Sequence, residues 1–534
     1  MRNGVIERVV ENWLTSANER QYQIPFCQVL SFEGEVVIYI SPHGVLEQGK
    51  DVITIGRDKV PRAYQLKGGK IQLKAWQDFK GELDELVEIP ISHPSIRSKR
   101  PHKPYLVTNG SVADSVLQRI ESNNKVWRKY NPNPLQLIHG SELVTRFVKA
   151  HGSFLPRETK DFSRLLELIV NAGPGPFDKE RFSSFLESVL PIRDAQRVSP
   201  RDVGRSISSA ILLTSYIVQG CEREKNYWAV FEAWVVVGSY ILGTAAKHRT
   251  PVQWWGESFT LCELAAVRAL EGLCEECVAN KMMITQDDPF TDGTFYGARV
   301  AILAGILSAL SLYHRVKLEK WNHEAFVHDF LTSYLRRIQV WGESAAPYLI
   351  MAALELEQHG AHLQSEQLVT HLVRTIVDLN GSKGRGLPNP YYEPEDALRL
   401  LLSLDTTNSE VFSGHSYSLE ALVEFLTRRL LRQALTHLWE KITKVHFTWF
   451  RPAEDWEWFR WKAEHGSLDT RMPNTPQSWA ALLDTAESES IAVPSLLRER
   501  PPFAFFFGLV FPHRFGVPLL RLLEHATRQS GQSQ

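Results

Sequence analysis

The hydrophobic period of this chain changes near residue 150, and that change limits the folds it can adopt more than any other feature. Up to that point, short runs of β-branched and aromatic residues alternate with stretches of helical spacing, a pattern typical of a sheet covered by helices. From about residue 158 onward, apolar residues recur at helical spacing almost throughout, as in residues 162–169, 300–312, 348–356 and 419–442. The sequence therefore predicts an α/β region followed by a large all-α region.

The first region can be divided into individual elements from its period and its turn residues. We expect helices at 5–18, 72–88, 111–123 and 141–150, and strands near 26–40, 51–56, 62–67, 104–108 and 135–138. The two strands at 51–56 and 62–67 are separated by the polar turn Arg57–Pro61, so they are predicted to pair as a hairpin.

We place a domain boundary between residues 150 and 151. The region 151–534 is interrupted by glycine- and proline-rich breaks at 173–176, 287–289 and 380–390, where helices end. Helices joined by short loops, without a strict repeat consensus, predict a helical array, with two subdomains if the break near 380–392 separates them. A chain of 534 residues with 43% apolar content can form more than one core.

Most of the tryptophans in the helical region are expected to pack between helices. The segment Glu454–Trp461 is different, because acidic and aromatic residues alternate in it and its rings cannot all face one core. We interpret this segment as a recognition or partner-binding surface.

The predicted hairpin carries three polar residues suited to phosphodiester chemistry. Gln65 and Lys67 lie two residues apart on one strand, so their side chains share a face. In an ordinary hairpin register, Asp51 at the head of the preceding strand meets them at one end. A carboxylate, an amide oxygen and an ammonium would then surround one point.

These groups suffice for metal-assisted hydrolysis. Mg²⁺, or Mn²⁺ in its place, takes oxygen ligands and keeps several waters, so Asp51 and the Gln65 carbonyl could bind it together with substrate phosphate oxygens. Lys67 could position the attacking water and stabilise charge at the phosphate. His43 and Glu47 lie on the loop that enters the first strand, from which they could reach the metal or its waters, and Glu47 is a further candidate ligand.

The set of Asp51 with Gln65-Leu66-Lys67 resembles the motif of the PD-(D/E)xK restriction-endonuclease-like nucleases, in the Mrr-like branch where glutamine replaces the second acid. The resemblance covers about the first quarter of the chain. It implies a nuclease domain at 1–150 with Asp51, Gln65 and Lys67 as catalytic residues. The first helix, Ile6–Leu14, resembles the helix in which such nucleases carry a supporting glutamate, a role that falls on Glu7, with Glu11 one turn later as the second choice. The chain departs from the strict pattern because it has no Pro-Asp dipeptide and no second carboxylate in the motif.

Charge is distributed unevenly along the chain. Residues 1–150 contain 21 Lys and Arg against 16 Asp and Glu, a net charge of +5, whereas residues 151–534 contain 39 against 45, a net charge of −6. A positive first domain suits a phosphate backbone. Its densest basic loop supplies four candidate DNA-binding residues, Arg97, Lys99, Arg100 and Lys103, although an exposed charged loop without a ligand would read the same.

Other classes of protein find little support in the sequence. No phosphate-binding loop of an NTPase, serine-hydrolase elbow or zinc-protease helix occurs. The five cysteines predict no disulfide framework, and Cys274 and Cys277 are interpreted as neighbours on one helix rather than a metal or redox site. The longest apolar run, Phe503–Phe511, is too short to span a membrane. We therefore expect a cytoplasmic protein without a membrane segment.

Together these features predict a Mg²⁺-dependent endonuclease that cuts DNA, regulated by its helical region. The resemblance to defence-associated nucleases implies an anti-phage or restriction role with partner subunits, and a homodimer would allow both strands to be cut. The alternative is a nuclease-fold subunit that no longer cuts and instead binds nucleic acid or scaffolds a defence complex. An RNase or junction resolvase on the same fold is a third hypothesis.

Overall fold

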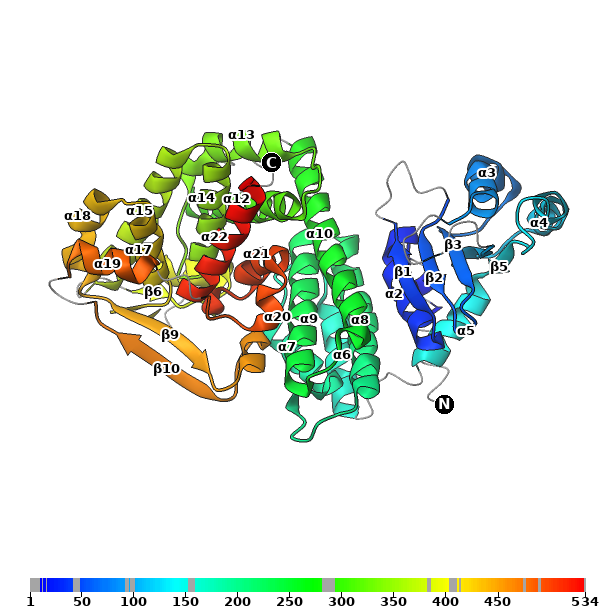
Figure 1. The fold of residues 1–534 in the computed structure, drawn as a ribbon, viewed down its shortest axis with the longest axis horizontal. Coiled ribbons are helices and arrows are strands. Elements are labelled where there is room, and N and C mark those ends of the chain that lie inside the picture. The colour runs from blue at the N-terminus through cyan, green and yellow to red at the C-terminus, as the bar shows by residue number, and fades with distance from the viewer. Residues whose placement is uncertain are drawn as a thin grey trace. The chain divides into compact units, whose positions relative to one another are not determined.

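The computed structural model divides the chain into two compact units, each built from several segments (Figure 1). Unit 1 comprises Met1–Ala172, Phe185–Arg223 and Pro251–Leu261, and unit 2 comprises Gly173–Ser184, Glu224–Thr250 and Cys262–Gln534. The structure describes residues 10–11, 13–15, 17–41, 49–91, 96, 101–151, 159–280, 293–381, 386–402, 411–412, 414–473, 477–487 and 491–532.

Unit 1 contains a mixed five-stranded sheet with the strands in chain order. Its strands are β1 (Val36–Ile40), β2 (Val52–Ile55), β3 (Pro61–Lys67), β4 (Lys103–Thr108) and β5 (Gln136–Ile138). The first three pair antiparallel, which confirms the predicted hairpin of β2 and β3, and β3, β4 and β5 pair parallel. The α/β character expected of the first region is therefore present.

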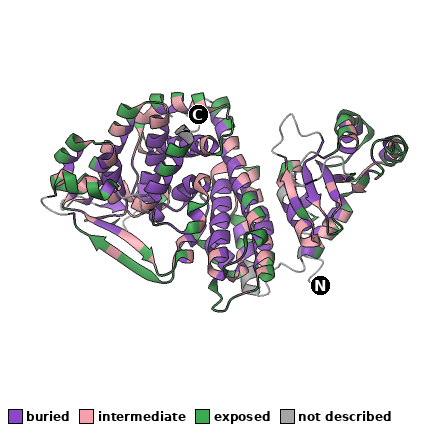
Figure 2. Cartoon of the chain, viewed as in Figure 1, coloured by how far each residue is buried: buried purple, intermediate pink, exposed green. Residues whose placement is uncertain are grey.

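Helices cover both faces of this sheet because its strands are apolar on both sides. On one face, Ile53 and Ala63 form a buried cluster with Trp76 and Leu83 of α3 (Leu73–Glu88). On the other face, Tyr64 packs against Phe26 of α2 (Glu19–Glu33), with ring centroids 5.4 Å apart. The central strands β2, β3 and β4 are accordingly mostly buried, whereas the outer strands β1 and β5 are less so (Figure 2).

The strand expected near residues 26–40 is wrong over its first half, because α2 extends to Glu33. Asn18 forms a capping box with Gln21 at the start of this helix, and Gly34 ends it in a left-handed conformation, φ 90°. Such caps satisfy the unpaired backbone groups at helix ends. Of the helix expected at 5–18, residues 10–11 and 13–15 are described and helical, residues 17 and 18 are not helical, and the others lie outside the described residues.

Further helices complete unit 1, and Trp13 packs against Tyr216 of one of them, α8, at a centroid distance of 4.8 Å. The remaining elements of unit 1 are α4 (Asp114–Trp127), α5 (Gly140–His151), α6 (Thr159–Asn171), η1 (Pro191–Arg193), α8 (Pro200–Arg223) and η2 (Val252–Trp254). Two helices, α7 (Lys179–Val189) and α10 (Gly256–Ala279), have residues in both units.

Unit 2 consists mainly of helices, as expected from the period of its apolar residues. Its helices are α9 (Tyr227–His248), α12 (Gly293–Lys317), α13 (Glu324–Tyr334), η3 (Leu335–Arg337), α14 (Ala345–Gln358), α15 (His362–Asn380), α16 (Pro394–Leu401), α17 (Leu419–Arg428), α18 (Arg432–Ile442), η4 (Asp455–Phe459), α19 (Trp479–Glu487), α20 (Ser495–Arg498), α21 (Pro501–Val510), η5 (Pro512–Arg514) and α22 (Val517–Gln532). By length and composition α9 and α12 could cross a membrane, but 94% and 89% of their apolar windows are buried inside the structure.

The prediction that this region is all-α is wrong in one respect, because unit 2 also contains short strands. They are β6 (Leu387–Pro388), β7 (Val411–Phe412), β8 (His415–Ser416), β9 (His446–Pro452) and β10 (Gly466–Arg471). The antiparallel ribbon of β9 and β10 is visible along the edge of unit 2 (Figure 1). Aromatic and β-branched residues at 447–450 favour a strand at β9, whereas β10 is mostly exposed and polar, so the hydrophobic period gave little signal for it. Residues 382–385 of the expected break near 380–392 lie outside the described residues.

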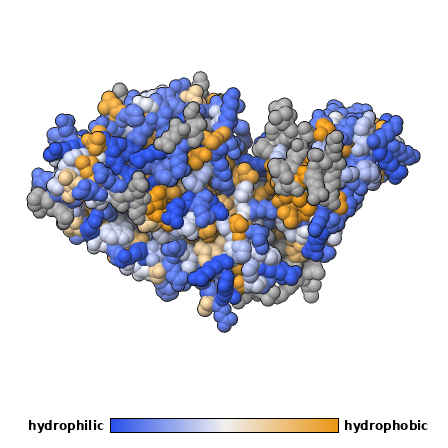
Figure 3. All heavy atoms as spheres, in the orientation of Figure 1, coloured by the Kyte–Doolittle hydropathy of each residue, from blue (hydrophilic) through white to orange (hydrophobic). Residues whose placement is uncertain are grey.

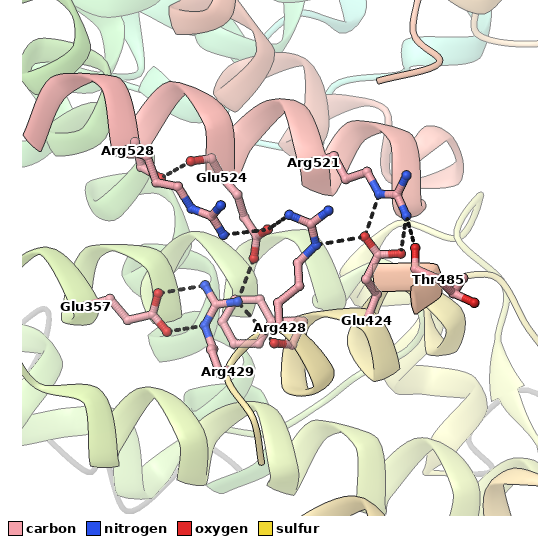
Figure 4. Close-up of polar contacts among 10 residues, drawn as sticks. Glu357, Glu424, Arg428, Arg429, Thr485, Arg521, Glu524 and Arg528 are labelled. Carbon is pink, nitrogen blue, oxygen red and sulfur yellow. Dashed lines mark hydrogen bonds and ion pairs between the residues drawn. The ribbon is translucent and has the colours of Figure 1, made fainter. Parts of the chain in front are cut away.

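A buried ion network fixes the C-terminal helix α22 to α17 (Figure 4). Glu424 of α17 accepts two hydrogen bonds from Arg521 of α22, at 2.6 and 2.9 Å, and a third from Arg428 at 3.1 Å. Glu424 and Arg521 are less than a tenth exposed. Every carboxylate oxygen of Glu424 therefore has a cationic partner.

The same network continues along α22. Glu524 accepts a hydrogen bond from Arg429 at 2.6 Å, and Arg429 also forms a bidentate pair with Glu357. Arg429 is thus shared between two carboxylates, and Glu524, at 2% exposure, is compensated by it.

Beyond this buried network, the visible outer face of the molecule is mostly hydrophilic (Figure 3).

Candidate functional site

Asp51 lies immediately before β2, opposite Gln65 of β3. The pairing of Val52 with Tyr64 sets this register, and the Asp51 backbone N–H donates to the Tyr64 carbonyl at 2.9 Å. The Asp51 side chain is 3% exposed, and its carboxylate accepts a hydrogen bond of 2.6 Å from the Leu66 backbone N–H. Residues opposite each other in an antiparallel pair share a face, so the structure brings Asp51 to the same face as Gln65.

The Gln65 side chain is buried but only half of its amide group is paired. Its nitrogen donates to a carboxylate oxygen of Glu82 at 3.1 Å. Its oxygen is buried and has no hydrogen-bond partner among the residues that the structure describes. Because an unsatisfied buried polar atom costs free energy, a native protein that retains one usually does so for a reason.

Lys67 lies two residues after Gln65 on the same face. Its ammonium forms an ion pair of 2.7 Å with Glu82 and lies 5.3 Å from the centre of the Phe79 ring. The Lys67 side chain is 15% exposed and that of Glu82 is 47% exposed. The pair therefore sits at the boundary between the protein interior and solvent.

Glu82 is the residue of this constellation that the sequence reasoning missed. It lies on α3 beside the buried Leu83 and contacts both Gln65 and Lys67. The period of α3 predicts which of its faces is apolar, but not how far along β3 the helix is placed. The only available signal was its position one residue before a core leucine in a helix expected to cover the sheet.

A glycine brings the chain before Asp51 against α3. Gly49 has φ +68°, and a Cβ there would lie 2.0 Å from the carbonyl oxygen of Glu82. Only glycine tolerates both the left-handed conformation and this approach. Lys50, which lies between Gly49 and Asp51, is buried, and its ammonium donates to the Glu85 carbonyl at 3.2 Å.

Burial changes the ionisation of two groups near this turn. Desolvation lowers the pKa of Lys50 to about 8, against an opposing effect of Glu85. Desolvation also lowers the pKa of His102 to about 4, partly offset by its hydrogen bond of 2.7 Å to the Leu86 carbonyl and reinforced by the charge of Lys50. His102 is therefore neutral at physiological pH.

The set Asp51, Gln65 and Glu82 presents hard oxygen atoms, which is the chemistry that Mg²⁺ and Mn²⁺ prefer. The unpaired amide oxygen of Gln65 and the buried carboxylate of Asp51 lie on the same face of the sheet. These residues fit a divalent cation, and the ammonium of Lys67 lies beside them.

Most of the remaining predicted site residues lie outside the part of the chain that the structure describes. Glu7, His43 and Glu47 lie outside the described residues, as do Arg97, Lys99 and Arg100. Lys103 pairs with Arg62 across β3 and β4, at the opposite end of β3 from Lys67. Its ammonium forms an ion pair of 3.1 Å with Asp58.

Two other groups of potential metal ligands have a structural explanation. Glu324, Glu355 and His359 place ligand atoms within 4.8 Å of one another, but Arg315 forms ion pairs with both glutamates, which supplies the positive charge they need. The five cysteines all lie in the described part of the chain, are buried and form no disulfide bond. Burial raises the pKa of Cys274 to about 12 and that of Cys277 to about 11, so neither thiol is activated.

Comparisons of the chain with known protein families, curated proteins and solved structures found no match.

Proposed function

We propose that this protein is a metal-dependent endonuclease that hydrolyses phosphodiester bonds of DNA at Asp51, Gln65 and Lys67. The observation that carries the proposal is the unpaired, buried amide oxygen of Gln65. Gln65 lies on the same sheet face as Asp51, which is opposite it, and as Lys67, two residues further along β3. A metal-binding role supplies the partner that this oxygen lacks.

In this proposal, some side chains bind the metal ion and another stabilises charge on the phosphate. Asp51 and Gln65 would hold the cation, which when bound polarises a phosphate oxygen and acidifies water. Lys67 orients the attacking water and neutralises charge that develops on the phosphate. Glu82 fixes the rotamer of Lys67 and the amide of Gln65 through its two contacts.

The wider proposal follows from charge and organisation. The net charge of +5 in residues 1–150 favours a nucleic-acid backbone as substrate. The large helical region would restrain the nuclease until a trigger or a partner subunit relieves it, as a cytoplasmic defence system against phage requires. A homodimer would place two sites on the two strands.

One observation favours the alternative, a nuclease-fold subunit that binds or scaffolds without cutting. The Lys67 ammonium is already paired with Glu82 at 2.7 Å, and Asp51 is the one carboxylate of the motif. If the pair with Glu82 is permanent, Lys67 is unavailable to the phosphate, and the site would retain only its capacity to bind.

The two functions separate in a cleavage and binding experiment on the full chain. Supercoiled and linear duplex DNA are incubated with Mg²⁺ or Mn²⁺, with an EDTA control, and binding is followed by fluorescence anisotropy. The variants are Lys67→Met and Gln65→Leu, and Lys70→Met is the matched control because Lys70 is exposed and lies three residues away.

A nuclease would cut in metal alone, and would lose cutting in Lys67→Met and Gln65→Leu but not in Lys70→Met. DNA binding without metal-dependent cutting, unchanged in Gln65→Leu, would establish the scaffold instead. Cutting that survives Lys67→Met would place the active site elsewhere in the chain.

A further inference from the structure

A second pocket lies in unit 2, far in sequence from the candidate nuclease site. Its volume is about 370 Å³, within the range of small-molecule sites. Residues of β9, η5 and the start of α22 line it, together with Trp458 of η4. Trp458 belongs to the acidic and aromatic segment 454–461 that the sequence singles out.

Arg514 of η5 is a buried cation at this pocket with an incomplete set of partners. The residue is 5% exposed. One guanidinium nitrogen, Nη2, donates to the carbonyls of Glu457 and Arg460 at 3.3 and 3.2 Å. The other two, Nε and Nη1, are buried without a hydrogen-bond partner in the part of the chain that the structure describes.

The positive charge of Arg514 persists at neutral pH. Desolvation lowers the pKa of its guanidinium to about 10, against opposing effects of Tyr391, Tyr240 and Glu457. The neighbouring His513 carries no charge, because burial and the Arg514 charge lower its pKa well below the usual range. An uncompensated buried cation is costly.

The other charged residues of the pocket compensate one another. Arg451 forms an ion pair of 2.7 Å with Asp469, and Arg471 pairs with Glu420. Arg514 forms no ion pair with a described carboxylate.

The carboxylate that most influences Arg514 is engaged elsewhere. Glu457 is 1% exposed, lies 3.8 Å from Arg460, and accepts a hydrogen bond of 3.3 Å from the His465 backbone N–H. Glu464 also pairs with Arg460, at 3.0 Å. Arg460 is thus shared between two carboxylates, and Glu457 also acts on the Arg514 guanidinium through its charge.

Aromatic rings form the rest of the wall. The Arg514 guanidinium lies 5.2 Å from the centre of the Phe450 ring. Phe450 and Trp458 line the pocket and are each half-buried. Trp449, also part of the lining, follows the strand alternation and points to the other face of β9 from Phe450. The faces of half-buried aromatic rings bind planar rings by stacking.

We infer that this pocket binds a small organic anion with a planar aromatic ring, such as a nucleotide. The anionic group pairs with the Arg514 guanidinium, and the ring packs against Phe450 and Trp458. This inference does not depend on the nuclease proposal. It gives the helical region a ligand of its own.

The test uses the full-length protein and two fluorescent probes of matched shape. 1-Anilinonaphthalene-8-sulfonate carries an aromatic body and one negative charge, and N-phenyl-1-naphthylamine has the same body without the charge. We expect the charged probe to bind about tenfold or more tightly than the neutral one. We also expect adenosine monophosphate, but neither adenosine nor inorganic phosphate, to displace it at the same concentration.

Three variants locate the binding. Arg514→Gln should weaken the charged probe by about tenfold or more and leave the neutral probe unchanged. Arg399→Gln is the matched control, because Arg399 does not line the pocket, is 51% exposed and is paired with Glu395 at 2.7 Å, and it should bind both probes as the wild type does. Ala492→Trp places bulk at an exposed position of the lining and should weaken both probes.

Two results would overturn the inference. One is equal affinity of the wild type for the charged and the neutral probe. The other is unchanged binding of the charged probe by Ala492→Trp, which keeps Arg514 and so remains informative even if Arg514→Gln does not fold.

Discussion

Two clusters of buried charged and polar residues in this molecule differ in how completely their polar atoms are paired. In unit 2, both oxygens of Glu424 are paired with guanidinium nitrogens of Arg521 (Figure 4). In unit 1, the amide oxygen of Gln65 is buried on a residue that shares its sheet face with Asp51 and Lys67, and it has no partner among the described residues. Glu424 and Gln65 are similarly buried, but only Glu424 has every side-chain oxygen paired.

This difference indicates which kind of observation points to function. A fully paired ion network is explained by the fold itself, since it satisfies the charges that helix packing buries. An unpaired atom in a polar cluster is not explained by the fold, so a ligand is the natural explanation. The proposals for Gln65 and for Arg514 both rest on this distinction.

The largest expected effect tests the completed cluster. Glu424→Ala leaves the buried Arg521 without its carboxylate, and we expect the free energy of unfolding of unit 2 to fall by about 3–5 kcal/mol. Differential scanning calorimetry of the full chain would show the corresponding drop in Tm.

Glu440→Ala is the control for that measurement. Glu440 is 87% exposed and pairs with Lys444 one helical turn away, so water screens the interaction and no measurable change is expected. If Glu424→Ala were as mild as this control, the ion network would not be structural and the comparison above would fail.

The second effect concerns His102, a buried group near the candidate site whose ionisation opposes folding. Its pKa is lowered from 6.5 to about 4 in the folded protein. Between these values the unfolded chain binds a proton that the folded chain does not, so stability is fully present above pH 6.5 and is lost as the pH falls toward 4. The loss amounts to about 3 kcal/mol.

Urea unfolding of unit 1, followed at pH 7, 6, 5 and 4, measures this dependence. His102→Gln should remove the part of the slope between pH 6.5 and 4 while other acid-sensitive groups still contribute. An unchanged slope in the variant would show that His102 is protonated in the folded protein.

The third effect tests the incomplete cluster. Gln65→Leu removes the unpaired oxygen together with its buried amide, so stability should be unchanged or slightly higher, because an apolar group of similar shape replaces an unsatisfied one. Cleavage, however, should fall about a hundredfold, or about 2.7 kcal/mol in activation free energy. Calorimetry and a plasmid-nicking assay on the same preparation give both numbers.

The opposite outcome would contradict the interpretation of Gln65 as a functional residue. A variant that is destabilised by several kcal/mol but retains full cleavage would mark Gln65 as a structural residue. The comparison between the two clusters would then reflect packing alone.

The sequence predicted well those elements that have strong local signals. The strands at 51–56, 62–67, 104–108 and 135–138 and the helices at 72–88 and 141–150 correspond to β2, β3, β4, β5, α3 and α5. The hairpin register also follows from the turn, and it places Asp51 opposite Gln65 as expected. Alternation and turn chemistry are local properties, so a single sequence contains them.

The sequence could not predict features that depend on tertiary placement. Aromatic and β-branched residues at 26–33 suggested a strand, but the capping box of Asn18 and burial against Tyr64 stabilise a helix there. The contact of Glu82 with Gln65 depends on where α3 lies along β3, and the incomplete pairing of Arg514 depends on segments more than fifty residues apart. No periodicity reports such distances.

The smallest expected effect separates the two clusters most finely. Glu82 forms an ion pair with Lys67 and is 47% exposed, so water screens the pair, unlike those of Glu424. Glu82→Gln should therefore lower the free energy of unfolding by less than about 1 kcal/mol, as measured by calorimetry beside Glu424→Ala.

The effect of Glu82→Gln on cleavage then distinguishes a positioning role from a restraining one. If Glu82 positions Lys67, its loss lowers kcat while KM for DNA stays the same, because the orientation of the ammonium affects the transition state more than binding. If Glu82 withholds Lys67 from the phosphate, kcat rises instead. Either change in kcat, at nearly constant stability, would place Glu82 in the working part of the site, whereas an unchanged kcat would make its pair with Lys67 an ordinary surface contact.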